Sequence, residues 1–242
     1  MYKGIYIAAS GAILKQTQLE VVSQNIANMN TSGYKKDNVS FKEYLLSTEA
    51  AAVPDGRAMS DYSEFKLDLS NGTIIRTGNP LDIAIDGNGM IALENGRYTR
   101  RGDLKRSSEG YLTSHDGAKV LGANGPILLP TDSTVIEIDP EGKVSAMQQD
   151  TNIPSDIDTI RIVEFGPDGG LAKSGNGQFT ATGAAGPSTS GVKQGYLETS
   201  NVDTVKEMIR MIDTMREYES YQKVIQMFDD ATAKVNNEMG RI

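Results

Sequence analysis

Apolar residues recur at helical spacing near both ends of this chain, whereas its middle shows a different pattern. Over residues 4–29 and again over residues 202–239, apolar positions follow one another at steps of three and four. Such steps place side chains on one face of a helix, and a stripe this narrow is typical of packing against another helix. The pattern predicts two long helices, and the second would extend about 57 Å, more than a small β domain alone would bury.

We predict that the two stripes form an assembly interface, which the motifs described below extend by two asparagines. The predicted interface residues are Ile5, Ala8, Ala12, Leu19, Val22, Asn25, Ile26, Asn28, Met29, Met208, Met211, Met215, Tyr218, Tyr221, Ile225, Phe228 and Val235. Lys15 is the one polar interruption of the first stripe. The methionines suit either ordinary core packing or an adaptable subunit contact, because Met fits imperfectly matched neighbours. The pattern leaves open whether the helices pair within one chain or between chains.

Between residues 73 and 182 the helical period gives way to alternation and short apolar runs. The turn formers Gly87-Asn88-Gly89 and Asn95-Gly96 separate the runs at 81–86, 90–93 and 97–100. Period-two runs joined by Asn-Gly and Asp-Gly units are the strongest short-range signal for hairpins. We therefore expect short antiparallel strands that form a small sheet folded on itself.

The predicted fold class is α+β, with long terminal helices in a coiled-coil-like bundle and a central all-β domain. Residues 1–33 and 200–242 would form the terminal helical assembly domain, 34–72 and 183–199 extended connecting segments, and 73–182 the β domain. We expect one strand at 65–69 and a flexible tip at 50–57. Gly33 is free to adopt a positive φ after the first helix. Thr204 with Glu207 has the spacing of a capping box, with Ser200 or Asn201 as alternative caps one turn earlier.

Composition excludes several classes of function. The net charge of −8 disfavours nucleic acid and anionic membranes as partners, and it resides in the middle of the chain, because the two ends together are neutral. The chain has no cysteine, which excludes disulfides, thiolate metal sites and a cysteine nucleophile. We expect neither a cleaved signal peptide, since the stripe continues beyond the apolar residues 4–14, nor a membrane-spanning segment.

Candidate chemistry is sparse. His115 is the only histidine and stands in a turn, where a solvated role is expected. Gly87-Asn88-Gly89 loosely fits a dinucleotide-binding fingerprint, but that motif requires a following helix and a strand is predicted. Arg100 and Arg101 are interpreted as solvated hairpin residues, with contacts to a neighbour's acids as the alternative. The sequence therefore predicts no enzyme activity, no cofactor, no metal site and no small-molecule substrate.

Three motifs, in order along the chain, resemble the flagellar rod, hook and hook-associated axial proteins. Residues 9–12 and 22–35 resemble the family's rod signature, and residues 78–89 with 98–103 resemble its central motif. Residues 195–202, 208–209 and 216–219 resemble its C-terminal block. Within the family, the length and residues 120–130 look most like the proximal-rod type, with the distal-rod type as the alternative. Met90-Ile91 stands where relatives usually have two phenylalanines, which weakens the match to the distal type.

The resemblance implies a structural subunit of the bacterial flagellar basal body, and hence a role in motility. Such subunits would leave the cell through the flagellar export apparatus without a cleaved signal, and would stack with copies of themselves and other rod proteins across the periplasm. Their terminal helices would form the inner layer of a helical drive shaft. The alternative from another class is a surface-binding β module with a helical stalk, although helices at both ends favour the axial interpretation.

Overall fold

A computed structural model of the chain describes residues 2–45, 58–130, 133–148, 154–166 and 170–239. The chain divides into two compact units, each with contributions from separate parts of the sequence. The helical unit comprises residues 1–27, 37–66 and 203–242, and the β unit comprises residues 28–36 and 67–202. The predicted fold class is confirmed: two long helices pack together, and the region between them consists of short antiparallel strands.

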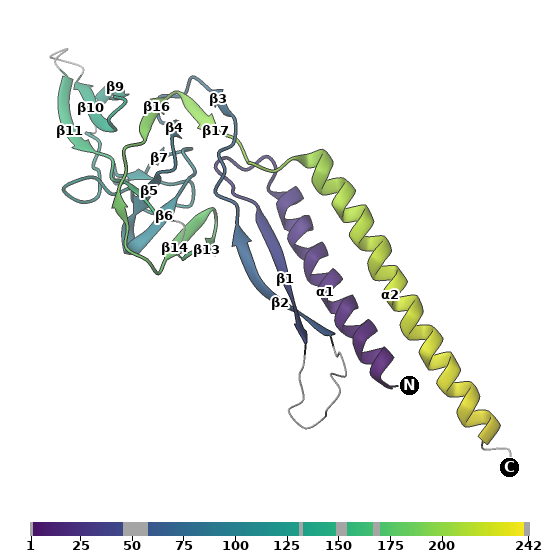
Figure 1. The fold of residues 1–242 in the computed structure, drawn as a ribbon. Coiled ribbons are helices and arrows are strands. Elements are labelled where there is room, and N and C mark those ends of the chain that lie inside the picture. Colours follow the sequence, from purple (N-terminus) through teal and green to yellow (C-terminus); the bar gives the residue numbers. More distant parts are fainter. Residues whose placement is uncertain (1, 46–57, 131–132, 149–153, 167–169, 240–242) are drawn as a thin grey trace. The chain divides into compact units, whose positions relative to one another are not determined.

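The helical unit contains two helices and a two-stranded sheet, β1–β2 (Figure 1). Its elements are α1 (Tyr2–Ala27), β1 (Asp37–Leu45), β2 (Ala58–Leu67) and α2 (Thr204–Met239). The sequence predicted a single strand at 65–69, so β1 is an addition and β2 begins earlier. The predicted flexible tip at 50–57 lies outside the described residues.

The β unit is built from short strands, of two to six residues each over the part of the chain that the structure describes. Its elements are β3 (Ile74–Arg76), β4 (Ile83–Asp86), β5 (Met90–Leu93), η1 (Glu94–Gly96), β6 (Arg97–Thr99), β7 (Lys105–Arg106), β8 (Leu112–Thr113), β9 (Ser133–Ile138), β10 (Lys143–Gln148), β11 (Pro154–Thr159), β12 (Ile162–Glu164), β13 (Leu171–Gly175), β14 (Gln178–Ala181), β15 (Gly186–Pro187), β16 (Gly191–Gln194) and β17 (Tyr196–Glu198). The largest sheet has the order β13-β14-β6-β5-β12-β15, and β11-β10-β9 form a second. The segment at 183–199 carries β15, β16 and β17, which pair with β12, β4 and β3.

The predicted hairpin between β5 and β6 is confirmed. Leu93 pairs with Arg97, and the intervening Asn95 and Gly96 have φ values of 62° and 68°. Two consecutive residues at positive φ give the turn a twist that matches that of the flanking strands, which is why Asn-Gly is favoured there. The strand β5 also follows the glycine turn at 87–89, so the helix that a dinucleotide-binding motif needs is replaced by a strand.

The core of the β unit lies on both faces of β5. Ile91 and Leu93 belong to the larger apolar cluster, which includes Val120 and Val144, while Met90 belongs to a second cluster. Alternate residues of a strand point to opposite faces, so one short apolar strand supplies two clusters. In the second cluster the rings of Tyr98 and Phe165 pack edge to face, with centroids 4.8 Å apart. The β unit thus has an apolar interior of its own, in two clusters on opposite faces of β5.

The helix α2 begins one residue after its cap. Asp203 accepts a hydrogen bond from the Lys206 backbone N–H at 3.2 Å, as an N-cap residue does, and this lowers the pKa of its carboxyl. The predicted capping box instead placed the cap at Thr204. The Glu207 carboxylate accepts a hydrogen bond from Arg210, one turn further along the helix.

Candidate assembly interface

The helices α1 and α2 lie side by side and run in opposite directions (Figure 1). Gly4 faces the ring of Phe228, Gly11 faces the ring of Tyr221, and Lys15 forms an ion pair with Glu217. Along these contacts the residue numbers increase on α1 and decrease on α2, so the two helices form an antiparallel pair within one chain.

The two glycines leave room on α1 for two aromatic rings of α2. A Cβ atom added to Gly11 would lie 2.6 Å from the Tyr221 ring, and one added to Gly4 would lie 2.6 Å from the Phe228 ring. Both the glycines and the aromatic residues are spaced by seven, which is the repeat of a coiled-coil seam. Any larger side chain at these glycines must therefore displace a ring.

The predicted interface residues differ in burial. Four are buried: Ala8, Ala12, Val22 and Asn25. Ten are half-buried: Ile5, Leu19, Ile26, Asn28, Met29, Met211, Tyr218, Tyr221, Ile225 and Phe228. The remaining three, Met208, Met215 and Val235, are exposed. Tyr221 and Phe228 face glycines of α1, and the Asn25 side chain bonds to the Asp37 backbone at the start of β1, so part of the predicted stripe is already covered within one chain.

A second apolar surface lies on the first turns of α2. Val205, Met208, Ile209, Ile212 and Met215 are between 48% and 68% exposed, and at about 100° per residue they span an arc of about 120°. We call these five residues the outer stripe of α2. The sequence stripe included only the two methionines. The signal for the others was present, because Val205, Ile209 and Ile212 also follow one another at steps of four and three.

The helical unit has few buried apolar side chains. Among the described residues of that unit they are Ala8, Ala12, Val21 and Val22, all on α1, whereas the buried residues of α2 are Glu207 and Thr214. Among the residues whose exposure the structure describes, the exposed large hydrophobic ones belong to the helical unit except for Ile75, Leu128 and Val135. Exposed apolar patches of this kind mark interaction surfaces.

A buried ionic cluster ties together five segments of the β unit. The Lys35 ammonium donates to Glu198 at 2.8 Å and to the Ser70 carbonyl at 2.7 Å. The Arg100 guanidinium also contacts Glu198, and it donates to the Ile85 carbonyl at 2.9 Å. The side chains of Lys35, Arg100 and Glu198 are each 2% exposed. One carboxylate therefore offsets two buried cations.

The electrostatics of the cluster follow from burial and charge. Burial lowers the pKa of Lys35, and its contacts with Glu198 offset this only in part. Burial alone would raise the pKa of Glu198, but Arg100 and the hydrogen bond from Lys35 outweigh it and hold this pKa below its usual range. Glu198 accepts a further hydrogen bond from the Gly72 backbone N–H at 2.8 Å. The carboxylate is thus held in its charged form.

The interpretation of Arg100 as a solvated hairpin residue was wrong, as was its alternative. Arg100 is buried because it donates to backbone carbonyls as well as to Glu198, and the planar fork of a guanidinium suits such multiple contacts. Arg101 instead pairs with Asp103, two residues along. The partners of Arg100 lie up to 98 residues away in sequence, so no local pattern marks it.

Gly33 adopts the predicted positive φ, at 64°. Its N–H donates to the Glu198 carbonyl at 2.8 Å, and a Cβ there would meet the Arg100 backbone. The turn after α1 is therefore closely packed beside the ionic cluster, and glycine is required both for its conformation and for its size.

Groups with possible chemistry are dispersed. His115 is half-exposed and contacts the Asp103 carboxylate at 3.1 Å. Within the described part of the chain no three His, Asp or Glu residues are placed to hold a metal ion. No helix in that part is long and apolar enough to cross a membrane.

Three family models match successive parts of the chain. Residues 5–35 match "Flagella basal body rod protein", and residues 84–146 match "Flagellar hook protein FlgE/F/G D1 domain". Residues 193–238 match "Flagellar basal body rod FlgEFG protein C-terminal". The matched regions include α1, much of the β unit, and α2.

Relatives match over almost the full length. The chain is 34% identical to the flagellar basal-body rod protein FlgG of Agrobacterium fabrum and 34% identical to FlgG of Bacillus subtilis, each over 98% of this chain and 99% of the relative. It is 28% identical to the rod protein FlgF of Mesorhizobium japonicum, over 91% of this chain and 90% of the relative. The likeness to FlgG is thus both higher and more complete.

Proposed function

This chain belongs to the FlgE/F/G family of flagellar basal-body rod proteins, which are structural and not enzymatic, and from this premise we propose that it is a distal-rod subunit. The observation that carries the proposal is the 34% identity to FlgG over nearly the whole of both chains. The sequence motifs favoured the proximal type, but the FlgF relative is less similar, and the comparisons therefore support the distal alternative better.

The proposed partners are copies of this chain and other rod proteins, with delivery through the flagellar export apparatus without a cleaved signal. The subunits would stack into the rod that crosses the periplasm. The outer stripe of α2 supports this role, because a neighbouring subunit could bury it. Each fully buried Val, Ile or Met contributes about 1.5–3 kcal/mol.

The helical unit also explains why assembly would be confined to a growing tip. An isolated helix is marginal in water, and ordering a residue costs about 1–2 kcal/mol of backbone entropy. Because the described part of the helical unit buries only a few apolar side chains, all on α1, the two helices gain little until several neighbours cover their exposed faces. A contact that repeats without closing generates a helical filament.

The second candidate is a proximal-rod subunit. Met90-Ile91 favours it, because the family resemblance implies a pair of phenylalanines at this place and the departure weakens the match to the distal type. Met90 and Ile91 are both buried, on opposite faces of β5, so this difference alters two apolar clusters.

Complementation tests the choice between them. The chain would be expressed in a strain that lacks FlgG and, separately, in one that lacks FlgF, with basal bodies then viewed by electron microscopy. We expect complete rods and restored swimming only in the strain without FlgG. Rescue only in the strain without FlgF would establish the proximal role, and rescue in neither would contradict the proposed function.

A further inference from the structure

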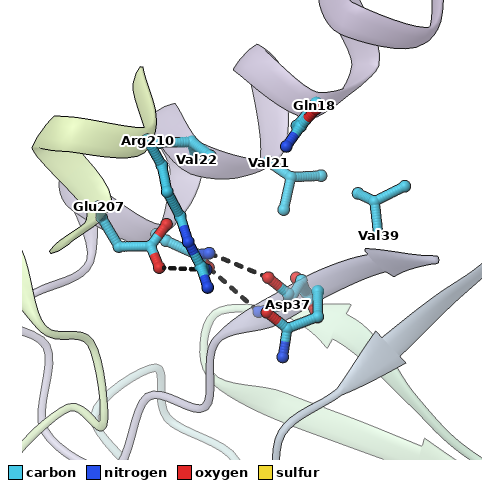
Figure 2. A pocket seen from close by; sticks show the side chains of 9 residues that line it. Gln18, Val21, Val22, Asp37, Val39, Glu207 and Arg210 are labelled. Atoms are coloured by element: carbon cyan, nitrogen blue, oxygen red, sulfur yellow. Dashed lines mark hydrogen bonds and ion pairs between the residues drawn. The ribbon is translucent and has the colours of Figure 1, made fainter. Parts of the chain in front are cut away.

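A pocket of about 230 Å³ lies within the helical unit, between α1, the start of β1 and the first turns of α2. Figure 2 shows the side chains that line it. Val21, Val22 and Val39 supply apolar surface, whereas Glu207 and Arg210 of α2 lie together and are joined by a hydrogen bond. The space greatly exceeds the about 30 Å³ that one water occupies in the liquid.

Glu207 is the unexplained group in this pocket. It is 2% exposed, and its Oε1 atom accepts a hydrogen bond from Arg210 at 3.0 Å. Its Oε2 atom is buried and has no hydrogen-bond partner among the described residues. A buried carboxylate oxygen without a donor is costly, because the water that it loses on folding is not replaced. The Arg210 side chain is itself 53% exposed, so its charge is partly screened.

The chemistry of the lining selects the kind of group that would fit. The lining combines the Glu207 carboxylate, one oxygen of which has no partner among the described residues, with the apolar surface of Val21, Val22 and Val39. A lysine or arginine side chain combines an aliphatic stem with a cationic donor, so it could contact both.

The chain carries suitable donors without partners on another face of α2. Arg216, Lys223 and Lys234 are exposed, and none has an ion-pair partner among the described residues. Their spacings of seven and eleven residues place them in one row along the helix. That row lies about 160–180° around the axis from Glu207, and Lys223 is about 24 Å further along it. Because α2 is continuous, the row cannot reach the pocket of its own chain.

We propose that the pocket receives a basic side chain from the Arg216–Lys223–Lys234 row of a second copy of this chain. The inference rests on the proposed function as a self-assembling subunit. Since the donor and acceptor lie on different faces, the contact is heterologous, and each copy offers a pocket to one neighbour and a basic row to another. A heterologous contact that repeats without closing into a ring generates a helical rod.

The test uses the full chain as the only copy in a strain that lacks its own subunit, with expression controlled by an inducer. The readout is the cellular level of the subunit at which half of the basal bodies carry a complete rod. We expect Glu207→Gln to raise this level at least about tenfold, because it removes one partner of a buried charge pair. Glu219→Gln, which removes an exposed charge from the same helix, should leave the level unchanged.

The donor is identified by combining variants. Arg216→Gln, Lys223→Gln and Lys234→Gln are made singly and together with Glu207→Gln. We expect one of the three to raise the level as Glu207→Gln does, with no further increase in that double variant, because both changes break one contact. The free Glu207→Gln subunit should unfold at the same temperature as the wild type or higher, since an unsatisfied buried charge is removed.

The outcomes separate the two proposals. If Glu207→Gln supports rods at the wild-type level, or no basic residue is coupled to it, the pocket holds water or another partner and the inference is wrong, although the function as a rod subunit stands. If the wild-type chain itself forms no rods, the proposed function fails and the inference fails with it.

Discussion

The two units of this protein bury their side chains in opposite ways. The β unit encloses a large apolar cluster that includes Ile91, Leu93 and Val120, and it also buries three charged side chains in one ionic cluster. The two helices of the helical unit, over their described residues, bury only small or medium apolar side chains and leave many larger ones exposed. The β unit therefore buries its apolar clusters within one chain, whereas the described helices of the helical unit leave apolar faces open. This difference indicates that the helical unit is the part that contacts neighbouring subunits.

The largest expected difference between the units is in hydrogen exchange. In the free subunit, we expect amides of β4 and β5 to exchange at least about 100-fold more slowly than those of α1 and α2. Strands around a complete core exchange near the global unfolding free energy, while weakly packed helices open locally. Exchange measured by mass spectrometry checks this, and equal protection of both regions would contradict it. In assembled rods the difference should shrink.

Removal of the central carboxylate should damage the β unit severely. We expect Glu198→Gln to lower the free energy of unfolding by about 3–5 kcal/mol, because Lys35 and Arg100 would remain buried without a counter-charge. Urea unfolding followed by tyrosine fluorescence measures the loss. The exposed Glu137→Gln is the matched control and should change little. A loss below about 1 kcal/mol would mean that water or other groups compensate the two cations.

The same carboxylate should make the β unit sensitive to acid. Since the pKa of Glu198 is held below its ordinary value of 4.5, its stabilisation is complete above that value. The stabilisation is lost as the pH falls through the lower pKa of the folded state, because protonation then favours the unfolded chain. Urea midpoints measured from neutral to acidic pH should therefore fall more steeply for the wild type than for Glu198→Gln. Parallel curves would show that Glu198 contributes nothing to acid unfolding.

The helical unit should respond to a larger side chain at the contact between α1 and α2. We expect Gly11→Val to destabilise the helix pair by about 1–3 kcal/mol, because the added atoms overlap the Tyr221 ring. Circular dichroism should show loss of helix at lower temperature, with the β unit unaffected. The exposed Ser23→Val, which introduces the same residue into α1, serves as the control. Equal effects of the two variants would show that helix propensity, and not packing, is responsible.

The smallest effect is expected at an exposed ion pair of the β unit. The Lys193 ammonium lies 2.6 Å from the Asp86 carboxylate, but the two side chains are 48% and 59% exposed. We expect Lys193→Ala to change the free energy of unfolding by less than about 1 kcal/mol, since water and salt screen such pairs. A loss comparable to that of Glu198→Gln would remove the distinction between buried and exposed pairs.

The sequence by itself determined the features that depend on local periodicity. Steps of three and four predicted the two helices, and Asn95-Gly96 predicted the β5–β6 hairpin, because side-chain direction and turn conformation are decided within a few residues. The positive φ of Gly33 was likewise predictable from the local sequence, because it follows from the turn after the first helix. The three family motifs, read in order, were also sufficient to indicate a flagellar axial protein, whereas the type of rod subunit required comparison along the whole chain.

Only the tertiary structure decided which polar residues become buried and which apolar faces remain open. Lys35 and Glu198 are 163 positions apart, and nothing near either residue indicates that they meet. Glu207 has the local pattern of a helix cap, yet it lines a pocket formed with α1 and β1. The outer stripe of α2 could be told from the residues that face α1 only once the structure showed which face of α2 is covered by α1. In each case the energy depends on partners that are distant in the chain, so burial and pairing follow from the fold and not from the local sequence.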